Sequence, residues 1–100
     1  MTGEIPHARP KATSKRLDET KRAIITEWRL AAGAETGWHR HAHDYIVVCL
    51  TAGQLTAETK DGSVVNNLAM GQTYARPVGV EHNIVNSGPG EFAFVEVELK

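Results

Sequence analysis

The sequence has no long apolar run, only one cysteine and almost no net charge. A membrane-spanning helix needs about 18 or more consecutive apolar residues, and a signal peptide begins with a shorter apolar stretch, so we expect neither. The single cysteine, Cys49, excludes an internal disulfide and is typical of a reducing compartment. These features predict a cytoplasmic protein with no membrane partner.

Neither positive nor negative charge predominates, because the chain has 11 Lys and Arg residues and 12 Asp and Glu residues, which gives a net charge of -1. A nucleic-acid partner requires a basic surface that neutralises phosphates, so we expect no nucleic acid to bind. A chain of 100 residues corresponds to a single small domain.

The distribution of apolar residues divides the chain in two. Residues 1–20 are polar, contain Pro6 and Pro10 and show no periodicity, which predicts an N-terminal arm that is flexible or ordered by a partner. Residues 21–100 read as short strands separated by turn signals, with Asp61-Gly62 as a type I′ hairpin signal. The clearest strands are expected at residues 24–30, 38–50, 55–58 and 92–99. This rhythm predicts an all-β sandwich or barrel.

Histidines are concentrated in one stretch of the expected sheet. His39, His41 and His43 occupy alternate positions, and His82 follows about forty residues later. Alternate residues of a strand point to one face, and imidazole is the commonest protein ligand for transition metals. Several buried imidazoles without a metal would leave polar nitrogens without partners. The pattern therefore predicts a metal site inside the sheet.

These residues also resemble the motifs of the cupin superfamily, which comprises small barrels of jelly-roll type. The spacing of the second cupin motif is matched without a gap by Gly71, Pro77, Gly79, His82 and Asn86. The histidine pair of the first motif corresponds to His39-Arg40-His41, and its closing turn corresponds to Gly53. The resemblance covers roughly residues 23–99 and implies a single-domain, RmlC-like jelly-roll barrel over residues 21–100.

The chain departs from the first cupin motif at its glutamate. The position of this glutamate falls on Tyr45 if three residues follow the histidine pair, which is the spacing we favour, or on Ile46 if four residues follow it. The resemblance implies metal ligation by His39, His41 and His82, and His43 is an alternative to His39. Three neutral ligands leave the charge of a divalent ion uncompensated, which favours a small anionic ligand. Imidazole accepts Fe, Mn, Ni, Zn or Cu, so the sequence does not select the metal.

Three other side chains have two interpretations each. Tyr45 is a candidate catalytic hydrogen-bond donor or general acid, or a ring that packs in the barrel. Arg76 either holds a carboxylate at the pocket mouth or forms a surface ion pair. Cys49 is interpreted as a buried, inert thiol rather than a reactive one.

The resemblance implies relatives that include oxygenases, isomerases and decarboxylases. The sequence therefore predicts a metal-dependent enzyme, such as a dioxygenase or isomerase, acting on a small anionic compound. A non-catalytic module that binds a ligand or a metal is the alternative, and a structural barrel that binds nothing is a weaker one. Strands that are apolar on both faces further predict a homodimer.

Overall fold

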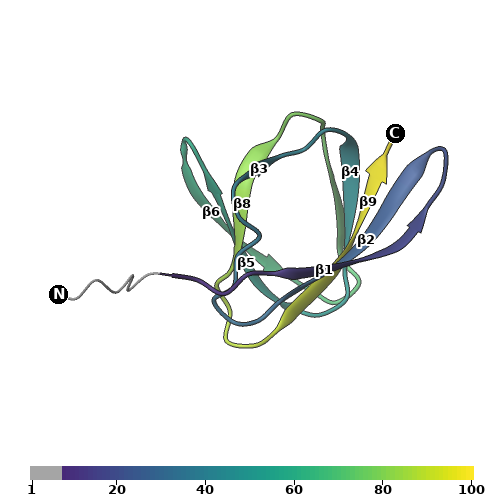
Figure 1. Ribbon diagram of the computed structural model, residues 1–100. Helices are drawn as coiled ribbons and strands as arrows, with labels where there is room; N and C mark the ends of the chain where they lie inside the picture. The colour runs from purple at the N-terminus through teal and green to yellow at the C-terminus, as the bar shows by residue number, and fades with distance from the viewer. Residues whose placement is uncertain (1–7) are drawn as a thin grey trace.

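The computed structural model describes residues 8–100, which form two antiparallel sheets that face each other (Figure 1). The five-stranded sheet has the order β1-β2-β9-β4-β7, and the four-stranded sheet has the order β3-β8-β5-β6. The strands are β1 (Thr13–Glu19), β2 (Ala23–Leu30), β3 (His39–Arg40), β4 (Asp44–Cys49), β5 (Gly53–Thr59), β6 (Gly62–Leu68), β7 (Thr73–Arg76), β8 (Glu81–Asn86) and β9 (Phe92–Leu99). The predicted all-β jelly-roll fold is confirmed.

The core lies between the two sheets. Each fully buried large apolar side chain contributes about 1.5–3 kcal/mol to stability, so this cluster stabilises the packing of the two sheets. Its members come from both sheets and from the loop after β2: Leu30, Ala34, Tyr45, Val47, Cys49, Leu55, Leu68, Phe92 and Phe94. Cys49 is 1% exposed, as expected for a buried thiol, and burial raises the pKa of that thiol.

The segment from Thr13 to Glu19 forms a strand, whereas the sequence indicated no element before Ala23. Its residues pair with β2 of the same chain, with an irregular register between Arg16 and Asp18, and all seven are exposed. The sequence missed this strand because neither of its faces is buried, so it lacks the apolar alternation that marks a half-buried strand. The division of the chain at residue 20 stays a prediction, and residues 1–7 lie outside the described part.

The predicted hairpin between β5 and β6 is present, but its turn lies one residue earlier than expected. Thr59 pairs with Gly62, so the two central residues are Lys60 and Asp61 rather than Asp61 and Gly62. Asp61 lacks the positive φ that a type I′ turn requires, and Gly62 adopts it instead, at φ 121°. The Thr59 hydroxyl donates to the Gly62 carbonyl at 2.8 Å and accepts the Asp61 amide at 3.1 Å.

The buried Asn86 at the end of β8 stabilises the loop that leads to β9. Its Nδ2 atom donates to the carbonyl of Leu30 at 2.9 Å and to that of Gly90 at 2.7 Å, and its Oδ1 atom accepts the Gly88 amide at 3.0 Å. The amide of Asn86 thus holds the two sides of this loop together. Residues 8–100 contain no helix long and apolar enough to cross a membrane.

Candidate metal centre

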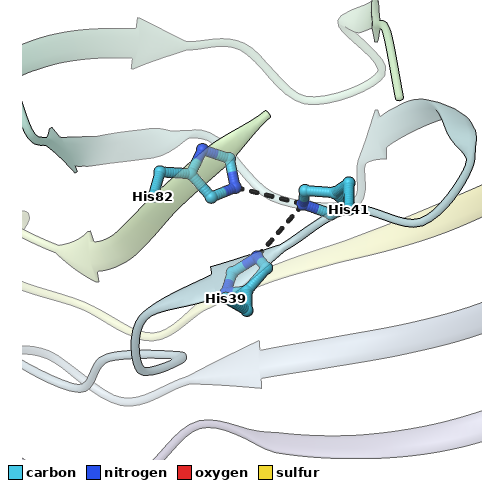
Figure 2. Close-up of side chains that lie close together, drawn as sticks. All are labelled: His39, His41 and His82. Carbon is cyan, nitrogen blue, oxygen red and sulfur yellow. Dashed lines mark hydrogen bonds between the residues drawn. The ribbon is translucent and has the colours of Figure 1, made fainter. Parts of the chain in front are cut away.

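Strands β3 and β8 bring two of the predicted histidines side by side as cross-strand neighbours. His39 is the register partner of His82, and His41 follows directly after β3. The Nε2 atom of His41 lies 3.0 Å from Nε2 of His39 and 3.1 Å from Nε2 of His82. Figure 2 shows the three rings converging on one point, with their Nε2 atoms toward one another. We call His39, His41 and His82 the histidine cluster.

The geometry of the cluster fits a transition-metal ion. Imidazole nitrogens bind such ions at about 2.0–2.1 Å, so three nitrogens in neighbouring coordination positions lie roughly 3 Å apart, as the two distances here do. One N–H donor on the His41 Nε2 atom satisfies only one of its two close nitrogen neighbours. Each of the three histidines offers one ligand nitrogen, and these nitrogens all lie within 4.8 Å of one another, so the cluster could hold a metal ion.

Burial keeps two of the rings neutral at physiological pH. It lowers the pKa of His41 to about 4, with further contributions from His39 and His82. It also lowers the pKa of His82 to about 4, helped by His39 and by the positive charge of Arg76. Neutral imidazole is the form that ligates a metal, so both rings are prepared for that role.

His43 stays outside the histidine cluster, contrary to the expected shared face. Strand β3 ends at Arg40, and β4 begins only at Asp44. The alternation of side chains needs a continuous extended backbone, and it is interrupted in the connection that carries His43. The spacing of His39, His41 and His43 therefore predicted the pair correctly but not the third member.

A hydrogen-bond chain behind His39 fixes the orientation of its ring. The Nδ1 atom of His39 lies 2.8 Å from the carbonyl oxygen of Gly37, so Nδ1–H donates there and Nε2 keeps its lone pair for a metal. The Gly37 amide in turn donates to Oδ1 of Asn83 at 2.9 Å. Such outer partners set the tautomer of a metal-binding histidine.

Asn83 belongs to a charged network that we call the N-terminal clamp, formed by Arg9, Glu35, Glu58 and Asn83. The Asn83 Nδ2 atom donates to Glu35 at 2.8 Å and to Glu58 at 2.9 Å. Arg9 contacts Glu58 through two 3.0 Å hydrogen bonds and Glu35 through a third. The Arg9 hydrogen bonds lower the pKa of Glu58, and those of Asn83 and Arg9 lower the pKa of Glu35. The clamp thus links the N-terminal segment to the support of His39.

The histidine cluster lines a cavity of about 430 Å³ between the sheets. The opposite wall comes from the five-stranded sheet and carries Tyr45, Tyr74, Arg76, Glu96 and Glu98. This volume is within the range of small-molecule sites. The cavity therefore has nitrogen ligands on one wall and oxygen-bearing side chains on the other.

Comparison with known proteins identifies the family. The chain is 50% identical over 92 residues to the Beta-alanine degradation protein BauB of Pseudomonas aeruginosa, covering 92% of this chain and 97% of that protein. The crystal structure of a cupin domain from Bordetella pertussis Tohama I matches with a TM-score of 0.90 and 49% identity, covering 93% of this chain and 97% of that one. The chain belongs to the cupin superfamily. An RmlC-like cupin from Shewanella frigidimarina shares the fold, with a TM-score of 0.68, 20% identity, and coverage of 88% of this chain and 75% of that one.

No family model matches the sequence of this cupin. Its membership therefore stands on the relatives and on the motif positions, which the structure places as the family pattern implies. Gly71 and Gly79 both adopt positive φ values of 81° and 95°, a conformation that glycine accepts at little cost.

Tyr45, the favoured position for the missing cupin glutamate, contacts the histidine cluster. Its ring stacks on that of His41, with centroids 3.7 Å apart and planes inclined by 16°. Burial, followed by the charge of Glu96, raises the pKa of its phenol above the ordinary value. Tyr45 is therefore a neutral side chain that stacks beside the cluster.

Three side chains of the opposite wall extend what the sequence indicated. Arg76 lies at the cavity with its guanidinium 4.7 Å from the ring centroid of Tyr74, and it forms no ion pair within residues 8–100. The surface ion pair, the interpretation we favoured from the sequence, is thus not formed among the described residues, and Arg76 lies at the cavity instead. Glu96 and Glu98 were not recognised as site residues, although they share one face of β9 with Phe92 and Phe94.

Proposed function

We propose that this cupin binds a divalent transition metal through His39, His41 and His82 and acts as a metal-dependent enzyme on a small carboxylate-bearing compound. The observation that carries the proposal is the convergence of three Nε2 atoms on one point in the wall of the cavity. A metal bound there supplies Lewis-acid or redox chemistry at coordination positions left open by three protein ligands.

The protein residues around the cluster have separate tasks in this proposal. The Gly37 carbonyl holds the Nδ1 proton of His39, so the metal-facing nitrogen stays deprotonated. Tyr45 holds His41 by stacking and presents a neutral phenol as a candidate hydrogen-bond donor or general acid to the substrate.

The name of the curated relative suggests the class of substrate. At 50% identity over nearly the whole chain, we propose a role related to the degradation of a small amino acid such as β-alanine. The reaction is oxygenase-like or an isomerisation, and the ligand carries an anionic group that binds at the metal.

The test begins with elemental analysis of protein purified without an affinity tag, followed by oxygen consumption and product analysis with a panel of small carboxylates. We expect about one metal ion per chain and turnover of a panel member that is lost on chelation. A His43→Gln variant is the matched control and should behave as the wild type. Absence of bound metal after reconstitution with Fe, Mn, Ni, Zn and Cu would falsify the proposal.

A non-catalytic cupin module is the second candidate, and the absence of the motif glutamate favours it. The position is held by a tyrosine whose ring is packed against His41, so the site lacks one ligand of the family pattern. This candidate predicts a ligand-induced rise in melting temperature without product formation or oxygen uptake.

We also propose that the protein is a cytoplasmic homodimer. Residues of β9 that alternate with the cavity-lining ones face outward, and Val97 lies in one row with Ile25 of β2 and Ile46 of β4. Burying an apolar outer face of this kind against a second protein surface is favourable. An isologous dimer, in which a second copy of the chain supplies that surface, is the commonest arrangement. Light scattering at micromolar concentration tests this proposal, and a monomer contradicts it.

A further inference from the structure

The wall opposite the histidine cluster presents two carboxylates to the cavity. Glu96 and Glu98 alternate on β9, so both point to the same face, and both line the cavity. We call them the carboxylate pair. Within residues 8–100, no hydrogen bond or ion pair neutralises either of them, although other acidic side chains, such as Glu35 and Glu58, are paired with Arg9.

Arg76 lies on the same wall but does not compensate the carboxylate pair. It belongs to β7, which is separated from β9 by β4. Its guanidinium is engaged by the ring of Tyr74 and by the carbonyl of Ala75, to which it donates at 2.9 Å. The carboxylates are therefore available to a cationic group that enters the cavity.

Burial of an unpaired carboxylate is unfavourable, and Glu96 shows this directly. Its pKa is raised to about 7, first by burial and then by the charge of Glu98. A cation placed beside the two carboxylates offsets both the cost of burying Glu96 and its repulsion by Glu98. The indole Nε1 atom of Trp28, which lines the same cavity, is also fully buried without an acceptor in the described chain. This wall thus has an indole donor and carboxylate acceptors that lack partners in the described chain, and a polar ligand could supply those partners.

The two walls together define a ligand with two ends. We infer that the cavity selects a small zwitterion, whose carboxylate binds at the histidine cluster and whose protonated amino group binds between Glu96 and Glu98. This inference rests on the proposed function, because the carboxylate end requires the bound metal. Facing sheets lie about 10 Å apart, which leaves room for a ligand of a few carbon atoms once the side chains of both walls are in place.

Charge favours the same occupant. A divalent ion at the cluster and two carboxylates opposite to it give the cavity a separated positive and negative end, and a zwitterion aligns with both without adding net charge. A dicarboxylate would place a second negative charge at the carboxylate pair, which is unfavourable at short distance. A plain monocarboxylate would leave the pair unneutralised.

The experiment compares three probes of similar size on the metal-reconstituted full chain by titration calorimetry: 3-aminopropanoate, propanoate and succinate. They share one carboxylate and differ at the far end, which is positive, neutral or negative. We expect 3-aminopropanoate to bind at least about tenfold more tightly than propanoate, as a charge-assisted hydrogen bond provides, and succinate to bind most weakly.

The variants Glu96→Gln and Glu98→Gln keep the shape of the wall and remove its charge. Each should reduce the preference for 3-aminopropanoate to within about twofold while propanoate affinity and metal content stay unchanged. Glu91→Gln is the matched control, because Glu91 precedes β9 and pairs with Arg29 outside the cavity; it should retain the full preference.

The outcomes separate this inference from the proposed function. Equal affinity for 3-aminopropanoate and propanoate in metal-loaded protein overturns the inference and leaves the metal site intact. Loss of metal in Glu96→Gln or Glu98→Gln also overturns it, because the carboxylates are then ligands of the ion. A wild-type chain that binds no metal contradicts the proposed function, whereas a preference for the amino probe in that same protein still supports the role of the carboxylate pair.

Discussion

The ring of Tyr45 stacks on the ring of His41, with centroids 3.7 Å apart. The contact joins the two walls of the cavity, because Tyr45 belongs to β4 of the five-stranded sheet, whereas His41 follows β3 of the other. At a position where the cupin motif has a charged glutamate, this chain uses an aromatic ring to orient a candidate ligand from the side.

Substitution of Tyr45 separates its ring from its hydroxyl. Tyr45→Phe keeps the stack, so we expect metal affinity within about twofold of wild type and, if the phenol acts on the substrate, a loss of turnover of about 10²-fold or more. Tyr45→Leu removes the ring and should cost about 2–4 kcal/mol of unfolding free energy and weaken metal binding. Chemical denaturation, metal titration and turnover measure the three effects. Equal metal affinity in the Leu variant contradicts the orienting role.

Removal of single histidines tests the membership of the cluster. His39→Gln, His41→Gln and His82→Gln should each lower metal affinity by more than the roughly 10–100-fold typical of losing an outer partner. His43→Gln should leave affinity unchanged, because His43 lies outside the group of converging nitrogens. Competition with a chromophoric chelator gives the four affinities. A weakened His43→Gln variant would instead restore the alternative in which His43 is a ligand.

Asn83 is a positioning residue for His39. Asn83→Leu removes the acceptor of the Gly37 amide, so the carbonyl that holds Nδ1 of His39 loses its anchor, and we expect metal affinity to fall about 10–100-fold. Asn67→Leu is the control, because Asn67 is exposed and only accepts a 3.1 Å hydrogen bond from Gln54. Nitrogen NMR of the imidazole rings reports the tautomer of His39, and an unchanged tautomer in Asn83→Leu contradicts the role.

Glu96 should make the stability of the metal-free protein depend on pH. Its pKa in the fold is about 7 against 4.5 as the ordinary value, so the fold favours the protonated acid. Its stabilising contribution is complete below pH 4.5 and is lost as pH rises to about 7. Each pKa unit corresponds to about 1.4 kcal/mol, so the loss is at most about 3 kcal/mol, and less because the carboxyl retains contact with water in the cavity.

Glu96→Gln removes this titration, so the variant should match wild type at pH 4 and exceed it in unfolding free energy at pH 8. The charged and titratable groups that face Glu96 are Glu98 on its own strand, Tyr45 on β4, Tyr74 and Arg76 on β7, and the histidine cluster across the cavity. Denaturant unfolding in the presence of a chelator gives the comparison. A pH-independent difference between the two proteins shows that Glu96 does not titrate in this range.

Two glycines provide a matched test of packing. A Cβ atom added at Gly53 would lie 2.8 Å from Cδ2 of Phe92, whereas one at Gly90 would meet no atom within 4 Å. Phe92 is among the most deeply buried side chains, so Gly53→Ala should cost about 1–3 kcal/mol through overpacking. Gly90→Ala should be neutral or slightly stabilising, because it restricts the unfolded chain. Thermal unfolding of the two variants measures the difference.

The rhythm of strands and turns was sufficient to predict an all-β barrel, and the resemblance to the cupin motifs implied that His39, His41 and His82 share one site. The sequence could not show which face of β9 points inward. Alternation separates Val95 and Val97 from Glu96 and Glu98, but hydrophobicity alone would bury the valines, whereas the cavity accepts the glutamates. The inward face depends on the polarity of the whole cavity and not on the strand.

Long-range contacts account for the other omissions. Arg9 contacts partners 26 and 49 positions away in the chain, a relationship that no local pattern encodes. The break that excludes His43 has the same origin, since β3 ends where its pairing with β8 ends, after Arg40 and Glu81. The signal at Asp61-Gly62 correctly predicted a hairpin. Its turn lies one residue earlier because the pairing of the flanking strands sets the register.

The N-terminal clamp has a practical consequence for anyone who handles this protein. Because Arg9 reaches the support of His39 through Glu35 and Asn83, a protease cut or an expression boundary placed between Pro10 and Thr13 would leave the barrel strands intact while loosening a ligand on the far side of the sheet. Preparations trimmed in this way are expected to fold normally and yet to lose metal during dialysis.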